Sequence, residues 1–403
     1  MMAVSSASAN KTRRSPLIWG LWVVAAVVGG MGLFQRFFHG DQGVDFSSYV
    51  PWGLWVVAYI YFSGLSAGAF LIAAAAYTLK IKALQPIARM CLLVAMVCLI
   101  MGIMAVGLDL GHMERTLLVF IRPQFHSMMA WMVWLYTVYF ILLVFMLSRA
   151  SKEARGGASA DHEQKALGKL GLIGIFLALG FAGGAGALFA TVSAREFWHT
   201  SLYPIFFMVG ALTSGAALVT AFTAWAWPVR NAAWQETVTM LGRIVRALVV
   251  IELVLGAAEY LIPAWYGVGP AYDLTKHVLF GPHWYVFWVF SLLLGVVVPL
   301  VLLSGKRSPG GIGLAAALVA VMFFAVRLNL VIPGLITPQI QGLGEAYTDP
   351  VGGKLSFLYM PTWFEWQVMV GIIAVGVALW YLGTRLLPWV LPSSSSQSSE
   401  VRS

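Results

Sequence analysis

Long apolar runs separated by short polar segments follow one another along the whole chain. Ten of these runs have about the 20 residues that a helix needs to cross a bilayer. Their approximate bounds are 17–35, 53–79, 87–108, 127–148, 168–192, 202–227, 243–263, 284–303, 312–331 and 365–387. In lipid every backbone polar group must be satisfied internally, which favours helices. The pattern therefore predicts an all-α polytopic membrane protein with ten transmembrane helices.

Composition agrees with this prediction. Hydrophobic residues make up 60% of the chain and charged residues 10%, whereas a soluble domain carries about 25% charged residues. The first apolar run has no clear small-residue cleavage site after it, so we expect it to be retained as a helix rather than removed as a signal peptide. The net charge of +9 does not indicate nucleic-acid binding, because the basic residues lie in short loops between the predicted spans.

The basic residues also predict the orientation. With the N-terminus inside, eighteen Lys and Arg residues fall on the inner side, six fall on the outer side, and Arg327 lies within a span. The positive-inside rule therefore predicts that both termini face the cytoplasm. We expect a multi-pass protein of the bacterial inner membrane.

A short repeat suggests how the spans are grouped. Residues 65–71 (LSAGAFL) resemble residues 212–218 (LTSGAAL) at the same point of two predicted spans. Duplication would give two four-helix bundles, spans two to five and six to nine, with a peripheral helix at each end. The alternative is a chance match of common residues. The resulting division is 1–38 (basic N-terminus and first helix), 49–149 with 168–192 (first bundle), 201–331 (second bundle), 332–363 (outer loop), 364–390 (last helix) and 391–403 (Ser-rich disordered tail).

The second predicted span carries small and polar residues on its length, namely Tyr59, Ser63, Ser66 and Gly68. Small side chains allow close approach of a neighbouring helix or of a flat ligand. The segment is therefore a candidate ligand groove as well as a candidate packing surface.

The outer end of the third span is rich in polar groups, with Asp109, His112, Glu114 and Arg115 close together. Histidine titrates near neutrality, so His112 could exchange protons with a reducible ring. The alternative is that these residues only anchor the protein at headgroup depth. Further outer residues that could dock a partner are Arg122, His126 and Arg195.

Three ionisable residues lie inside predicted spans: Glu252, Glu259 and Arg327. Each costs roughly 2.5–3.5 kcal/mol at a helix centre on insertion scales, so each is a functional candidate. Glu252 and Glu259 are seven residues apart and share a helix face. They could form a proton path together with Arg327. Alternatively they are a structural pair in which one carboxylate neutralises the charge of Arg327.

Several kinds of chemistry are not predicted for this chain. None of the seven histidines is central to a span, as the ligands of a b-type haem would be. Cys91 and Cys98 are too few for an iron–sulfur cluster or a zinc site. The sequence has no dinucleotide fingerprint, P-loop or nucleophile elbow. We therefore expect no haem and no metal bound by this chain.

Several segments resemble the NrfD/PsrC family, the integral membrane subunits of polysulfide-reductase-type complexes. They are PWGLW, YFSGLSAGAF, GLDLGHMER followed by SMMAW, REFWHTSLYPIFFMVGALTSGAAL and RLNLVIP. The segment YMPTWFEW is similar to the ten-helix branch, which includes DsrP of the DsrMKJOP complex and the hydrogenase-2 membrane subunit. The resemblance covers nearly the whole chain.

The resemblance implies two four-helix bundles and a quinone pocket (menaquinone or ubiquinone) near the outer face of the first bundle. By position, the pocket would use Tyr59, Ser63, Ser66, Gly68, Asp109, His112, Glu114 and Arg115. It also implies a periplasmic ferredoxin-like iron–sulfur subunit, and further subunits such as a c-type cytochrome or a catalytic subunit. Many relatives carry Arg-Pro where this chain has His112-Met113, so the identity of the proton acceptor stays open.

The expected function is electron exchange between the membrane quinone pool and the iron–sulfur subunit, in a DsrP-like sulfur-metabolism complex. His112 would take a proton from the ring, with Asp109 orienting its imidazole. The chain would be a quinol-oxidising or quinone-reducing subunit, or non-catalytic alone. Alternatives are the membrane subunit of a hydrogenase or molybdopterin oxidoreductase complex, a pure membrane anchor, and a secondary transporter. A transporter would be expected to have interrupted helices at matching positions in its two halves.

Overall fold

The computed structural model describes residues 16–156, 160–227, 230–305, 308–338, 340, 342–346 and 355–392. All regular elements in these ranges are helical. The basic residues Lys11, Arg13 and Arg14, and the Ser-rich tail from residue 393 on, lie outside the described residues.

Nine helical segments in the described ranges are long and apolar enough to cross a membrane. Eight are built on α1 (Pro16–His39), α2 (Leu54–Thr78), α3 (Ala88–Asp109), α5 (Met128–Ala154), α6 (Ala160–Ala190), α7 (Tyr203–Ala226), α11 (Pro309–Ile336) and α13 (Trp363–Leu386). The ninth joins the π-helix η3 (Val286–Val297) to α10 (Val298–Ser304). The prediction of an all-helical polytopic membrane protein is thereby confirmed.

The predicted seventh span, 243–263, lies within α8 (Ala232–Tyr266), which is not among the nine. This helix has 35 residues, about 52 Å at 1.5 Å per residue, so it is longer than the roughly 30 Å hydrocarbon core. Its ionisable residues are Glu236, Arg243, Arg246, Glu252 and Glu259. The count of ten spans and the N-in, C-in orientation remain predictions.

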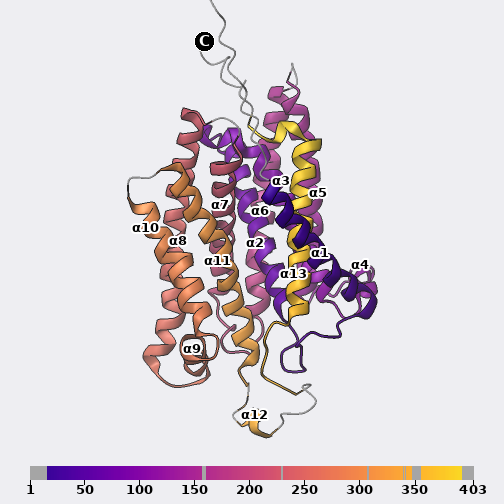
Figure 1. The fold of residues 1–403 in the computed structure, drawn as a ribbon, viewed down its shortest axis with the longest axis vertical. Coiled ribbons are helices and arrows are strands. Elements are labelled where there is room, and N and C mark those ends of the chain that lie inside the picture. Colours follow the sequence, from indigo (N-terminus) through magenta and orange to yellow (C-terminus); the bar gives the residue numbers. More distant parts are fainter. Residues whose placement is uncertain are drawn as a thin grey trace, which may run out of the picture.

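The long helices pack in two groups (Figure 1). In the first, α2 contacts α3 and α6, and α5 contacts α6 and α3. In the second, α7 contacts α8 and α11, and η3 and α10 contact α11. Both α2 and α6 also pack against α7, across the division. The grouping into two four-helix bundles stays a prediction, and the names first bundle and second bundle are kept for the two groups.

The two copies of the short repeat face each other at the α2–α7 crossing. A Cβ built on Gly68 would lie 2.1 Å from the carbonyl oxygen of Ala211, and one on Gly215 would lie 2.5 Å from the Cα of Gly68. Only glycine permits this separation of the backbones. The matching small residues therefore join the two bundles.

The first and last long helices, α1 and α13, pack against each other. Here too glycines meet, because a Cβ on Gly29 would lie 2.3 Å from the Cα of Gly371. Trp22 Nε1 donates a hydrogen bond to the carbonyl oxygen of Ala374 at 3.1 Å. Helix α13 also contacts α3, so this pair of helices lies on the first bundle.

Shorter helices mark one end of the molecule. These are η2 (Met113–Leu117), α4 (Leu118–Ile121), α9 (Pro270–Phe280) and α12 (Leu343–Ala346). Figure 1 shows α9 and α12 toward the lower end, α4 at the right a little below mid-height, and the C-terminal end of α13 toward the upper end. The lower end is the one predicted to face outside, and it is called the outer end below.

Candidate functional site

The N-terminus of α2 is capped by side chains from the last quarter of the chain. The backbone N–H of Leu54 donates to the Tyr359 hydroxyl at 2.7 Å and lies 3.4 Å from a carboxylate oxygen of Glu365. Glu365 is fully buried and also accepts from the Asp45 N–H at 3.2 Å and from the Tyr359 hydroxyl. It forms a capping box with Thr362 at the start of α13. One carboxylate therefore satisfies orphan donors of two helix starts.

Arg36, near the end of α1, is buried and holds the outer end of α3. Its Nε and one terminal nitrogen donate to the carbonyl oxygens of Leu108 and Leu110, both at 2.7 Å. The guanidinium carbon lies 5.6 Å from the centroid of the Trp55 ring. Carbonyl groups at a helix end have no intrahelical partner, and a cation is favoured there.

Asp109, the last residue of α3, lies between these two features. Its Oδ1 is buried and has no hydrogen-bond partner among the described residues. Its charge interacts with Arg36 and with Glu365. Burial, together with the charges of Glu365 and Asp109, holds the pKa of the Tyr359 hydroxyl well above its usual range. We call Arg36, Asp109, Tyr359 and Glu365 the acid cluster.

The predicted contact between Asp109 and His112 is wrong. The Nδ1 of His112 lies 2.9 Å from an oxygen of Glu114, and Arg115 Nε lies 3.9 Å from the same oxygen. The three side chains are 64%, 69% and 65% exposed. The chain leaves α3 in an extended conformation at Leu110, and His112 then lies on the surface. Hydrogen bonds from its own backbone N–H and from His112 lower the pKa of Glu114.

Tyr59 and Ser63 lie where α2 meets α3 and α5. The rings of Tyr59 and Tyr136 are edge to face, with centroids 5.8 Å apart. The Ser63 hydroxyl donates to the carbonyl oxygen of Ile60 at 3.2 Å. A Cβ on Gly102 of α3 would lie 3.2 Å from the Ser63 nitrogen. Gly102 and Asp109 are seven residues apart, so Asp109 lies on the α2-facing side of α3.

Ser66 and Gly68 contact neighbouring helices. The Ser66 hydroxyl donates to the carbonyl oxygen of Ala95 in α3 at 2.7 Å, and it lies 3.3 Å from the Tyr139 hydroxyl of α5. Gly68 is covered by α7, as described above. The small-residue groove predicted to admit a ring is therefore filled by protein at these two positions.

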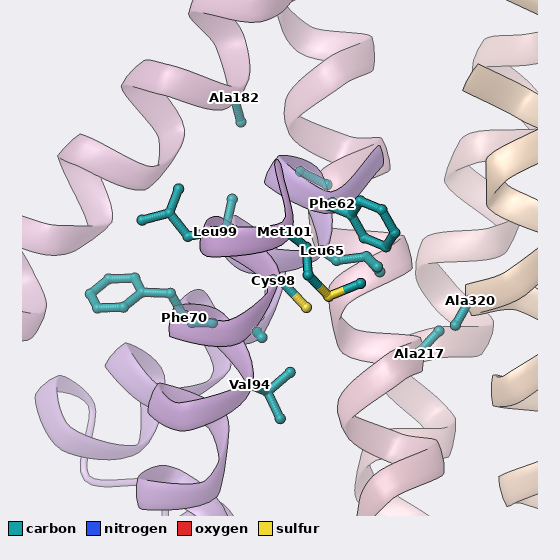
Figure 2. Packing of buried hydrophobic residues seen from close by; sticks show 14 of the residues in the cluster. Phe62, Leu65, Phe70, Val94, Cys98, Leu99, Met101, Ala182, Ala217 and Ala320 are labelled. Atoms are coloured by element: carbon teal, nitrogen blue, oxygen red, sulfur yellow. The ribbon is translucent and has the colours of Figure 1, made fainter. Parts of the chain in front are cut away.

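An apolar cleft of about 440 Å³ lies beside this closed groove, among α2, α3, α7, α11 and α13. Its lining includes Phe62, Leu65, Val94, Cys98, Met101, Leu218, Phe222, Val321, Phe324, Trp366, Met369, Ile373, Val377 and Trp380. Figure 2 shows Phe62, Leu65, Cys98 and Met101 gathered on one side of α2 and α3, whereas Phe70 and Leu99 point to the other.

The cleft is open toward the lipid-facing surface, and its outer part is lined by Trp366 and Met369 of α13. Val321, Ile373 and Val377 are 58%, 41% and 48% exposed. At the outer end, Met369 lies one helical turn after Glu365, on the same face of α13. A long apolar chain could therefore enter from the bilayer with its end directed toward the acid cluster.

Arg195, a predicted docking residue, is engaged inside the protein. Its guanidinium donates to three carbonyl oxygens at the end of α11, those of Gly334, Leu335 and Thr337, at 3.0, 3.1 and 3.1 Å. It also reaches the Tyr49 carbonyl oxygen at 3.4 Å. Partial burial lowers the pKa of Arg195. The side chain joins the bundles rather than facing a partner.

Arg122 and His126 are exposed at the outer end, beside α4. Arg115 is exposed in the same outer segment, next to exposed Glu114, and Arg115, Arg122 and His126 are called the basic outer surface below. This surface is accessible to a partner protein.

The predicted in-membrane ionisable residues lie together in the second bundle. Glu252 and Arg327 are buried, at 8% and 1% exposure. Glu259 accepts a hydrogen bond from the Tyr203 hydroxyl at 3.0 Å. The charge of Arg327 acts on both carboxylates.

Three residues of the acid cluster were not among the predicted site residues. Arg36 counted only as an outer-side charge, and Tyr359 and Glu365 lie in YMPTWFEW, which carried only the resemblance. The spacing of Thr362 and Glu365 before an apolar run is that of a capping box, and it predicts the local role of Glu365. No local pattern indicates that Arg36 contacts residues 108 and 110.

Residues 44–339 match the model of the family described as polysulphide reductase, NrfD. The chain belongs to this family. The chain is 31% identical over 397 residues to the C subunit of the selenate reductase of Mesobacillus selenatarsenatis, covering 90% of this chain and 92% of the relative. It is 26% identical to the Hdr-like menaquinol oxidoreductase integral membrane subunit of Archaeoglobus fulgidus, covering 91% and 92%. The putative membrane C subunit of a dimethyl sulfoxide reductase of Halobacterium salinarum is 27% identical, covering 82% and 81%.

The predicted family is thus confirmed. The family and the apolar helices together identify the chain as a multi-pass integral membrane protein. The described residues contain no group of three or more His, Cys, Asp or Glu that could hold a metal ion.

Proposed function

We propose that this chain exchanges electrons between the lipid quinone pool and an iron–sulfur subunit at its outer end, in a bacterial inner membrane. The observation that carries the proposal is the buried, unpartnered Oδ1 of Asp109 beside Arg36. An open apolar cleft lies further inward along the same helix, with Met101 about 12 Å from Asp109 along α3. One relative is named as a subunit of a menaquinol oxidoreductase. A quinol has the matching chemistry, a polar ring on a long apolar chain.

The apolar chain of the quinol would lie in the cleft among α2, α3 and α13. The ring would lie at the outer end of the cleft, on the inner side of the acid cluster. Oxidation of a quinol to a quinone releases two electrons and two protons. Asp109 accepts each proton in turn and passes it to outer water, while both electrons go to the clusters of the iron–sulfur subunit. The same groups serve the reverse reaction, in which the ring gains two electrons and two protons.

His112 and Glu114 have a different role in this proposal from the predicted one. Their exposure suits a surface proton carrier between Asp109 and water. Tyr59, Ser63 and Tyr136 do not line the cleft, and in this proposal they act only by packing α2 against α3 and α5. Ser66 and Gly68 contribute by holding α2 against α3 and α7.

The partner would dock on the basic outer surface formed by Arg115, Arg122 and His126. An iron–sulfur subunit with acidic loops would be complementary to it, and such complementarity mainly raises the association rate and specificity. Further subunits, such as a c-type cytochrome or a catalytic subunit, would complete the complex.

The kind of complex has two candidates. A DsrP-like sulfur-metabolism complex agrees with the segment YMPTWFEW. A reductase of the molybdopterin class is favoured by the 31% identity to the selenate reductase relative and by the relative named for dimethyl sulfoxide reductase. We place the chain in the second group, as the membrane subunit of such a reductase.

Quinone-analogue binding to the purified chain, followed by fluorescence quenching, tests the proposal. We expect Asp109→Asn to weaken binding at least tenfold, because an amide cannot replace the carboxylate as the charged hydrogen-bond acceptor for the ring and charge partner of Arg36. His112→Ala should change affinity less than threefold, since the ring is exposed. Glu236→Gln, exposed on α8, is the control.

Other results would select other functions. If Asp109→Asn leaves saturable binding unchanged, the quinone site must lie away from the acid cluster. The absence of saturable binding to the wild type would favour the anchor or the secondary transporter.

A further inference from the structure

A second polar site lies inside the other bundle. A cavity of about 20 Å³ is enclosed by α7, α8, η3 and α11. Its polar lining consists of Thr213, Glu252 and Ser291, and its remaining lining is apolar apart from glycine. A cavity above about 10–15 Å³ with two to four polar partners can hold one water molecule. Its size and lining therefore match a single buried water.

Glu252 directs an unsatisfied carboxylate into this cavity. The residue is 8% exposed, and neither carboxylate oxygen has a hydrogen-bond partner among the described residues. A buried charge without a partner is strongly unfavourable. The carboxylate therefore requires a proton, a bound water or both.

The other cavity residues can complete the coordination of a water. The Ser291 hydroxyl accepts from Asn329 Nδ2 at 3.2 Å and donates no hydrogen bond within the described residues, so its proton is available. The Thr213 hydroxyl donates to the Val209 carbonyl at 2.8 Å, so its lone pairs can accept. A water could thus accept from Ser291 and donate to Thr213 and Glu252.

Arg327 supplies the opposite charge. Its guanidinium carbon lies 4.4 Å from the Phe207 ring centroid and 5.0 Å from that of Phe323. Its Nε and Nη1 are buried and have no hydrogen-bond partner among the described residues. Gly210 makes room for it, because a Cβ there would lie 2.6 Å from Nη2.

We propose that this cavity is a proton-binding site, in which a single water joins Glu252 to Ser291 and Thr213 while Arg327 provides the counter-charge. The proton moves between the water and Glu252. Glu259, seven residues toward the outer end and hydrogen-bonded to Tyr203, is the next acceptor on the same face of α8. The site depends on none of the groups proposed for the quinone.

Other titratable groups around Glu252 are few. Its own helix contributes Glu259, α11 contributes Arg327, and α7 contributes Tyr203 through Glu259. The π-helix η3 contributes the neutral Ser291. A proton fits this setting better than a metal cation, because only Thr213, Glu252 and Ser291 offer side-chain oxygens, whereas a hard cation takes about six or more oxygen ligands.

Infrared difference spectroscopy of the purified full-length chain in nanodiscs tests the proposal directly. Among the carboxylic-acid C=O bands that appear when the pH is stepped, one should be lost in Glu252→Gln and kept in Glu236→Gln, whose side chain is exposed. Ser291→Ala should shift this band and remove the O–H stretching band of the bound water, which is identified by its shift in H₂¹⁸O. Thermal unfolding of each variant checks folding, and Glu252→Asp provides a second variant if Glu252→Gln unfolds.

Three results would overturn the proposal. The titrating band could persist in Glu252→Gln, or keep the same frequency and titration in Glu252→Asp, which would place the proton elsewhere. The band could be unaffected by Ser291→Ala. This result would show that no water bound by Ser291 contacts Glu252. The band could move with sodium concentration at constant pH, which would indicate a cation site. None of these readouts uses a quinone, so failure here is independent of the function proposed above.

Discussion

The guanidinium of Arg36 connects the first helix to the end of α3. Asp109, the central residue of the candidate site, is the last residue of that helix. Arg36→Gln removes charged donors from two buried carbonyl groups, and each such bond contributes roughly 1.5–3 kcal/mol. We expect a loss of at least that size in unfolding free energy, measured by chemical denaturation in detergent. Arg122→Gln, at an exposed site, should be neutral, and a matching loss there would contradict the assigned role of Arg36.

Individual residues also define what the sequence could predict of the site. The polar groups at the end of α3 and inside the second bundle were predictable, because ionisable residues in apolar runs are costly and rare. The residues that these groups contact in the structure could not be predicted. Asp109 lies beside Arg36 and Glu365, which are far from it in the chain, and His112 faces Glu114 because the backbone extends at Leu110.

At the scale of helices, glycines decide how closely the bundles approach. Gly64 and Gly68 lie one turn apart on α2, but a Cβ on Gly64 would lie 3.7 Å from the nearest atom and one on Gly68 only 2.1 Å. Overpacking of a close contact costs about 1–3 kcal/mol. Gly68→Ala should therefore destabilise the protein by this amount and Gly64→Ala should not, as measured by denaturant unfolding. Equal effects would argue against the close α2–α7 crossing.

The helices themselves were largely predictable, because apolar runs of this length have few alternatives in a membrane. Helix α8 is the exception. Its predicted span covers 243–263, but the helix extends from Ala232 to Tyr266, since nothing between residues 232 and 243 breaks it. The grouping of α1 with α13 was not predicted, because the approach of Gly29 to Gly371 depends on residues at opposite ends of the chain.

At the scale of the whole molecule, the two bundles would have different roles in electron and proton transfer. Electrons and quinol protons would be handled at the outer end of the first bundle, and a further proton would be held near Glu252 in the second. The two sites share a rigid connection through the α2–α7 crossing and through Tyr61, whose hydroxyl donates to the Ala320 carbonyl of α11 at 2.8 Å. A change in the packing of α2 could therefore reach α11, which carries Arg327.

This arrangement makes a prediction about proton movement in the intact complex. In sealed vesicles containing the complex, we expect Glu252→Gln and Glu259→Gln to reduce the number of inner-side protons taken up per electron, because the second bundle loses a carrier. Quinol-dependent electron transfer should continue, since the acid cluster is unchanged. Glu236→Gln should keep both quantities at the wild-type value. An unchanged ratio in both variants would limit the Glu252 site to local proton storage, whereas loss of electron transfer would mean that the two bundles cannot work separately.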